Sequence, residues 1–100
     1  MSVLIDLSIF PVDKGKSLSS YVARVIKIIK ESGLPHKFGP MGTSMEGEWQ
    51  EVMGLVERCL DELKKDCDRI YMTLKVDYRK DVAGRLEGKV MSVETKLKSS

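Results

Sequence analysis

The stretch GPMGTSMEGEW, residues 39–49, turns the chain back on itself and leads directly into a helical pattern. It opens with Gly39 and Pro40, which break regular structure, and continues with small, sulfur-bearing and acidic residues. Because these residues bury little apolar surface, one interpretation is an ordinary exposed hairpin. The other is a small-ligand pocket, since glycine lets a backbone approach another group closely, and Thr43 and Glu46 supply hydrogen-bonding atoms. The residue types alone leave both interpretations open.

Around this stretch the chain divides into short strands and longer helices. Residues 36–41 and 43–47 predict two strands that form a hairpin, with Gly42 near their junction. From Glu48 onward the apolar spacing becomes helical. The positions that carry it are Trp49, Val52, Met53, Val56, Cys59, Leu60 and Leu63.

Upstream, Val3–Val12 alternates with a period of two, which predicts a half-buried strand. A helix follows, whose apolar positions are Leu18, Tyr21, Val22, Val25, Ile26 and Ile29. We expect Ser17, Ser19 or Ser20 to cap its start. Ser32 and Gly33 end it, and Pro35 prevents its continuation.

Downstream, Asp68–Arg79 is the second alternating strand. Its apolar side holds Ile70, Met72, Leu74 and Val76, and its mixed side holds Tyr71, Thr73, Lys75 and Asp77. A charged C-terminal helix is predicted from one apolar stripe, made of Leu86, Val90, Val93 and Leu97.

The order of these elements predicts an α+β fold, a ferredoxin-like βαββαβ sandwich with an added C-terminal helix. Residues 1–100 form a single domain in this prediction. Both main helices cover one face of a four-stranded antiparallel sheet and leave the other face open. Asp6 and Ser8 are expected on that open face, beside Thr73, Lys75 and Asp77. A face of such mixed character favours a subunit contact over a ligand site.

Composition excludes several function classes. The chain has 42% hydrophobic and 32% charged residues and a net charge of +2, which is typical of a globular protein and gives no reason to propose nucleic acid or an anionic membrane as partner. No apolar run approaches the length of a membrane span, about 20 residues. The N-terminus lacks the pattern of a secretion signal, so we expect a cytoplasmic location.

The chemistry-bearing residues form no catalytic or metal pattern. Cys59 and Cys67 are the only cysteines and His36 is the only histidine, too few for a structural zinc site. Cys59 is expected to pack as a small hydrophobe and Cys67 to lie in a polar turn, and a disulfide is disfavoured in a reducing compartment. No nucleotide phosphate loop occurs. We therefore expect a protein that is not an enzyme and holds no metal.

Four segments together resemble a known family. They are LSIFP at Leu7–Pro11, SLSSYV at Ser17–Val22, PMGTSMEGE at Pro40–Glu48 and DRIYMTLKVDYR at Asp68–Arg79. In this order they are similar to the small thiamine-binding protein family, and the likeness covers nearly the whole chain. The resemblance implies a ferredoxin-like fold that forms dimers and then tetramers through its open sheet face. It also implies a pocket for thiamine or its hydroxymethyl-aminopyrimidine half.

The resemblance carries candidate ligand-binding residues onto this chain. The candidates are Ser8, Ser20, Tyr21, Met41, Gly42, Thr43 and Glu46. Lys75, Asp77 and Arg79 fall on the last-strand motif. Our hypothesis is that Thr43 and Glu46 fix the pyrimidine, with Ser8 and Ser20 nearby, because hydroxyls and a carboxylate match the donors and acceptors of an aminopyrimidine.

Two other functions stay open beside this non-enzymatic binding. The same motifs can shape the contacts of a purely structural or regulatory homo-oligomeric module without a thiamine ligand. Glu46 or Asp77 can also serve as the acid–base group of an enzyme that acts on a small heterocycle, which would require a strongly raised carboxyl pKa in a closed pocket.

Overall fold

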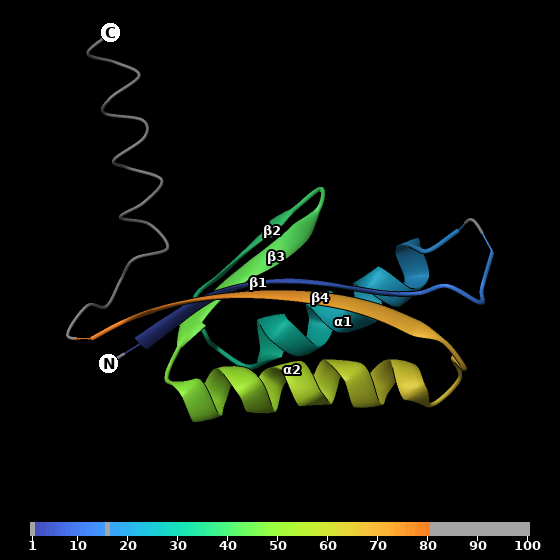
Figure 1. The fold of residues 1–100 in the computed structure, drawn as a ribbon. Coiled ribbons are helices and arrows are strands. Elements are labelled where there is room, and N and C mark those ends of the chain that lie inside the picture. Colours follow the sequence, from blue (N-terminus) through green and yellow to red (C-terminus); the bar gives the residue numbers. More distant parts are fainter. Residues whose placement is uncertain (1, 16, 81–100) are drawn as a thin grey trace, which may run out of the picture.

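The computed structural model describes residues 2–15 and 17–80. Their elements are β1 (Ser2–Pro11), α1 (Ser19–Glu31), β2 (His36–Gly39), β3 (Gly42–Gly47), α2 (Trp49–Lys64) and β4 (Ile70–Arg79). Figure 1 shows both helices on one side of the sheet, with α2 running along the long strands β1 and β4. The prediction of a small α+β fold is confirmed, and the predicted helix over residues 86–97 lies outside the described residues.

The sheet has four strands in the order β2-β3-β1-β4, and every pair is antiparallel. The register sets which side chains share a face, because directly opposed residues point the same way. Ile5 stands between Met45 and Val76, and the next residue, Asp6, stands between Ser44 and Lys75. The predicted alternation of β1 and β4 is therefore confirmed, and Asp6 and Ser8 share the open face with Lys75 and Thr73.

The core lies between the sheet and the helices. β1 contributes every second residue to it, which is the pattern expected of a strand with one covered face. The buried apolar residues are Val3, Ile5, Leu7, Ile9, Val25, Ile29, Met45, Val52, Leu55, Val56, Cys59, Leu63 and Cys67. Cys59 packs as predicted, and both cysteines are free. Cys67 follows the turn at the end of α2, as predicted, and in addition its side chain is only 7% exposed and belongs to the core.

The start of α2 and the end of α1 agree with the predictions, whereas the start of α1 does not. α2 begins with a capping box between Glu48 and Glu51, and α1 ends beside Gly33, whose φ of 77° suits glycine. The prediction of a serine cap for α1 is wrong: Leu18 occupies the N-cap position, and no side chain caps it. Ser17 precedes the N-cap residue, and Ser19 and Ser20 lie within the first turn, so none of the three serines occupies the N-cap position.

A guanidinium joins the two helices. Arg24 on α1 donates from Nε to Glu62 Oε1 at 3.2 Å and from Nη1 and Nη2 to the two carboxylate oxygens of Asp66 at 3.0 and 3.1 Å. Nη2 also reaches the backbone carbonyl of Glu62 at 2.8 Å. The hydrogen bond from Arg24 lowers the pKa of Asp66, and hydrogen bonds from Lys65 and then Arg24 lower the pKa of Glu62.

These lowered pKa values predict an acid-dependent loss of stability. A carboxyl group whose pKa is lower in the folded state stabilises the fold above its unfolded pKa, and this contribution disappears as the pH falls through the folded pKa. We expect the stability difference between the wild-type protein and Arg24→Met to be present at pH 7 and to shrink below pH 4. Urea unfolding from pH 7 to pH 2 measures it, and a pH-independent difference would contradict the ion-pair explanation.

Among the described residues, no helix has the length and apolar character needed to cross a bilayer.

Candidate functional site

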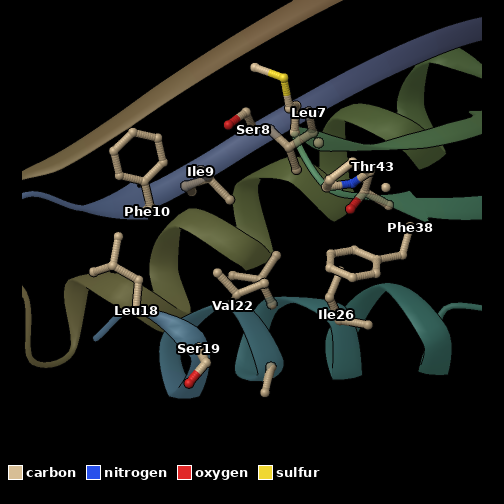
Figure 2. Close-up of a pocket in the computed structure, with 16 residues that line it drawn as sticks. Leu7, Ser8, Ile9, Phe10, Leu18, Ser19, Val22, Ile26, Phe38 and Thr43 are labelled. Atoms are coloured by element: carbon tan, nitrogen blue, oxygen red, sulfur yellow. The ribbon is translucent and has the colours of Figure 1, made fainter. Parts of the chain in front are cut away.

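A cavity of about 710 Å³ lies between β1, α1 and the β2–β3 hairpin. This volume is in the usual range for small-molecule sites. Figure 2 shows its walls, with side chains of α1 facing those of β1 and the hairpin. The lining residues are Leu7, Ser8, Ile9, Phe10, Leu18, Ser19, Val22, Ala23, Val25, Ile26, Phe38, Gly39, Pro40, Met41, Gly42 and Thr43.

The cavity exists because two strands of the sheet have different lengths. β3 pairs with β1 only from Val3 to Leu7, whereas β4 continues beside β1 as far as Pro11. Beyond Leu7, β1 therefore has a neighbour on one side only. The first half of α1 passes over this notch, and the hairpin closes its other side (Figure 2).

Gly42 sets how closely the hairpin approaches β1. A Cβ at this position would lie 3.0 Å from Asp6 Oδ1 and 3.1 Å from the backbone oxygen of Leu7. Both distances are shorter than ordinary van der Waals contact, so a larger residue would push the start of β3 away from β1. The close approach of the two strands thus explains why the Met41-Gly42-Thr43 motif has a glycine at its centre, and this glycine lies at the edge of the cavity.

The walls are apolar and aromatic. Along one wall, Leu18 at the N-cap of α1 lies near Phe10, and Ile26 on α1 lies beside the ring of Phe38 from the hairpin, with Val22 between them (Figure 2). Phe38 is 62% exposed and Met41 is 87% exposed, which is unusual for side chains of this size in a small protein. Among the described lining residues none carries an ionisable side chain. Such a surface suits a planar, uncharged ring.

Few polar groups point into the cavity. The hydroxyls of Ser8 and Ser19 are directed away from it in Figure 2, and the register puts the Ser8 side chain on the open face opposite Thr73. Thr43 is different, because its side chain stands on the helix side of the sheet opposite Leu7 and Phe38 and is only 4% exposed. Within the described part of the chain, its hydroxyl makes no side-chain hydrogen bond.

The backbone of β1 offers a second polar group. The carbonyl of Leu7 points toward β3, since it lies next to Gly42. Residues two apart on a strand direct their N–H and C=O groups to the same side, so Ile9 also faces the side of β3. β3 has already ended there, and no described strand pairs with Ile9 on that side. The notch therefore presents a backbone donor and a backbone acceptor.

The structure brings some of the predicted ligand-binding residues together and separates others. Met41, Gly42 and Thr43 line the cavity, and Ser8 lines it without directing its hydroxyl inward. Ser20 and Tyr21 are not among the lining residues. Ser20 is exposed, and the Tyr21 ring packs at the core edge with the Arg24 guanidinium 5.6 Å from its centre.

Glu46 lies away from the cavity. Its side chain stands on the open face opposite Leu4, while Thr43 stands on the helix side, so the two cannot contact one ligand within the same cavity. Glu46 is 4% exposed and accepts a hydrogen bond from Ser2 Oγ at 3.5 Å. Asp77 also shares the open face with Leu4.

The α1 wall of the cavity was missed by the sequence analysis. Leu18, Val22 and Ile26 were predicted only as apolar positions of a helix, because their spacing of four is that of an ordinary apolar helix face. Phe38 was assigned only to a strand. The signal that could have indicated this wall is the number of apolar positions on α1, which is larger than one sheet can cover.

Other reactive groups form no site in the described residues. No cluster of histidine, cysteine and carboxylate side chains that could hold a metal occurs among them. Burial raises the pKa of the Cys59 thiol to about 11, so this group is protonated and unreactive at neutral pH. The Nδ1 atom of His36 lies 2.9 Å from the carbonyl oxygen of Leu34, two residues away.

The fold and cavity define a small α+β protein with a ligand-sized apolar site at the end of its sheet. The thiamine-binding protein family matches residues 5–94, and the chain belongs to this family. A UPF0045 protein of Mycobacterium bovis is 35% identical over 98 residues, covering 97% of this chain and 96% of the relative. A UPF0045 protein of Synechocystis sp. is 36% identical and covers 100% of this chain and 84% of the relative.

Solved structures agree with the fold. A hypothetical protein from Methanocaldococcus jannaschii superposes with a TM-score of 0.85 at 32% identity, over 93% of this chain and 96% of that one. A Thermotoga maritima protein, whose proposed role is thiamine biosynthesis or salvage, superposes with a TM-score of 0.83 at 26% identity, over 93% and 99% of the two chains.

Proposed function

We propose that this protein binds thiamine or its hydroxymethyl-aminopyrimidine half without transforming it, as a carrier, buffer or sensor. The observation that carries this proposal is the apolar cavity with Met41, Gly42 and Thr43 at its edge. The family to which the chain belongs and the proposed role of the Thermotoga relative support the choice of ligand.

The chemistry of the cavity suits such a ligand. An aminopyrimidine is flat and uncharged at neutral pH, and it stacks on or packs against aromatic and methionine side chains. Phe38 and Met41 provide these groups at the mouth of the cavity, and their exposure leaves them available to a ligand. The absence of an acid–base pair in the described lining favours binding over catalysis.

The assembly and the fold class belong to the same proposal. We assign the topology to the ferredoxin-like class, supported by the strand order β2-β3-β1-β4 with both helices on one face. We expect a homodimer or homotetramer formed through the open face, where Phe10 and Tyr71 pack with ring centres 5.7 Å apart and Tyr71 is 55% exposed. The C-terminal helix and the cytoplasmic location stay predictions.

A purely structural module is the second candidate. It would be favoured if the central motif lay in a closed contact without a cavity. Met41, at 87% exposure and beside a cavity of about 710 Å³, favours the binding protein instead.

Isothermal titration calorimetry with hydroxymethyl-aminopyrimidine and with thiamine tests the proposal. We expect saturable binding at micromolar or lower Kd, and mass spectrometry of the recovered ligand should find it unchanged. A ligand that is converted during incubation would indicate an enzyme. No saturable binding of either compound, checked at two temperatures so that a zero binding enthalpy is not mistaken for absence, would favour the structural module.

A further inference from the structure

We propose that the outer edge of β4 pairs with the same edge of a second copy of this chain, so that two sheets join into one about a two-fold axis at Val76. This contact is separate from the open sheet face, and it goes beyond the proposed function because it requires no ligand. Three features of β4 carry the inference: its exposed backbone, the apolar side chains beside it, and the order of charges along it.

The two edges of the sheet differ in how well they are protected. β2 is four residues long and lies between Pro35 and Pro40, and proline interrupts strand pairing. β4 forms the other edge (Figure 1), is ten residues long and contains neither proline nor glycine. A long unprotected edge is a template for pairing with another strand. β4 is therefore the edge at which a partner strand is expected.

The direction of the backbone groups at this edge follows from one hydrogen bond. The N–H of Val12 donates to the carbonyl of Arg69 at 2.9 Å, so Arg69 directs its backbone groups toward β1. Because the direction alternates along a strand, residues 71, 73, 75, 77 and 79 also face β1. The residues between them, such as Leu74 and Val76, direct their N–H and C=O groups outward. No described strand pairs with β4 on that side.

The side chains beside this edge are apolar on the helix side of the sheet. Val76 lies opposite the buried Ile5, yet it is 44% exposed, so the helices leave it uncovered. Pairing about Val76 places this side chain against Val76 of the second copy, and Leu74 against Tyr78 of the second copy. Directly opposed aliphatic and aromatic side chains stabilise a strand pair. The contact would also bury apolar surface that a single chain exposes to water.

The charges on the other side of β4 select the register. Lys75 and Asp77 stand on the open face. With the axis at Val76, Lys75 of each copy lies directly opposite Asp77 of the other copy, which gives two pairs of opposite charge. An axis at Lys75 would oppose two lysines, and an axis at Asp77 would oppose two aspartates, which destabilises a strand pair. The charge order therefore favours an axis at Val76.

Cysteine crosslinking tests this register. Lys75 and Asp77 direct their backbone groups to β1, so between copies they would form a pair without direct hydrogen bonds, with Cα atoms about 4.5 Å apart. That separation suits a disulfide. We expect Lys75→Cys/Asp77→Cys to form a covalent dimer under mild oxidation on a non-reducing gel. The wild type, whose Cys59 and Cys67 are buried, is the control and should not crosslink. Efficient crosslinking of Lys75→Cys alone would indicate an axis at Lys75 and overturn the register.

Val76→Lys tests the contact itself. The Val76 side chain is exposed on the helix side, so a single chain can accommodate lysine there, whereas the pair would bring two ammonium groups together at the axis. We expect the mass of the assembly, measured by sedimentation velocity, to fall to half that of the wild type, with an unchanged circular dichroism spectrum. Val76→Thr keeps a neutral β-branched side chain and is the matched control, so it should keep the wild-type mass.

Charge reversal supplies an independent readout. Lys75→Asp and Asp77→Lys should each weaken association about tenfold, and the double variant should restore it to within about threefold of the wild type. Asp6 lies opposite Lys75 within the chain, so Lys75→Asp also changes the single chain. The double variant keeps that internal change, so its recovery would indicate that the two charges face each other between copies.

The inference is overturned if the wild-type protein is a monomer at every concentration tested, or if Val76→Lys keeps the wild-type mass. The second result would mean that the edge of β4 takes no second copy and that any assembly uses the open face alone. Ligand binding by the single chain bears on neither result. Failure of this inference is therefore distinct from failure of the proposed function, which calorimetry tests separately.

Discussion

Replacement of Val22 by tryptophan is expected to weaken the binding of hydroxymethyl-aminopyrimidine by about 100-fold or more, equivalent to about 2.8 kcal/mol. Val22 extends from α1 toward β1 and lines the cavity (Figure 2). An indole at this position would occupy the space that the ligand ring needs. Because the cavity is open to solvent at the exposed side chain of Met41, the larger ring can be accommodated without displacing the core.

Lys27→Trp is the matched control for this variant. Lys27 is exposed on the same helix and is not among the lining residues, so it adds the same side chain outside the cavity. We expect it to bind with the affinity of the wild type. Calorimetry measures both variants, and circular dichroism verifies that each is folded. If Val22→Trp is folded and binds normally, the ligand site lies elsewhere, and the open sheet face becomes the candidate.

The second large effect is on stability. Ile29→Ala is expected to reduce the free energy of unfolding by about 2–5 kcal/mol, because it removes a fully buried side chain and leaves a cavity in the core. Ile29 is 0% exposed and joins α1 to the centre of the core. Since domains of this kind are stable by only about 5–15 kcal/mol, the change is a large fraction of the total.

Lys30→Ala is the control for Ile29→Ala. It is the next residue on α1, it is exposed, and its replacement should change the stability by less than about 0.5 kcal/mol. Urea unfolding at one fixed protein concentration measures both, because association of subunits makes the apparent stability depend on concentration. Equal effects of the two variants would contradict the packing of α1 on the sheet.

The elements follow from local sequence patterns. The alternation of β1 and β4 was visible in the sequence, because each strand has one covered face and the period of two records it. Gly33 and the Glu48 region marked helix ends for equally local reasons. The start of α1 was predicted wrongly, because several serines stand close together and only the three-dimensional path selects Leu18 as the N-cap.

The site was predicted less completely than the fold. The Met41-Gly42-Thr43 part of the central motif lines the cavity, whereas Glu46, three residues after Thr43, faces the opposite side of the sheet. Residues an odd number of positions apart on a strand point to opposite faces of the sheet. The sequence therefore indicates the separation of Thr43 and Glu46 once the segment is known to be one continuous strand. The α1 wall had no separate signal, because Val22 in a cavity wall has the same spacing as Val25 in the core.

The amino-acid sequence by itself determined the types and order of the elements, the two faces of the long strands, and the motif of the family. These properties depend on residues close to one another in the chain. The tertiary structure decided where the cavity lies, because that depends on β3 beginning only at Gly42, so that it leaves β1 beyond Leu7 without a neighbour while β4 continues, and on α1 crossing the resulting notch. It also decided that Thr43 is buried beside the cavity. Strand lengths and the packing of distant segments control both results, and no local pattern of residues encodes them.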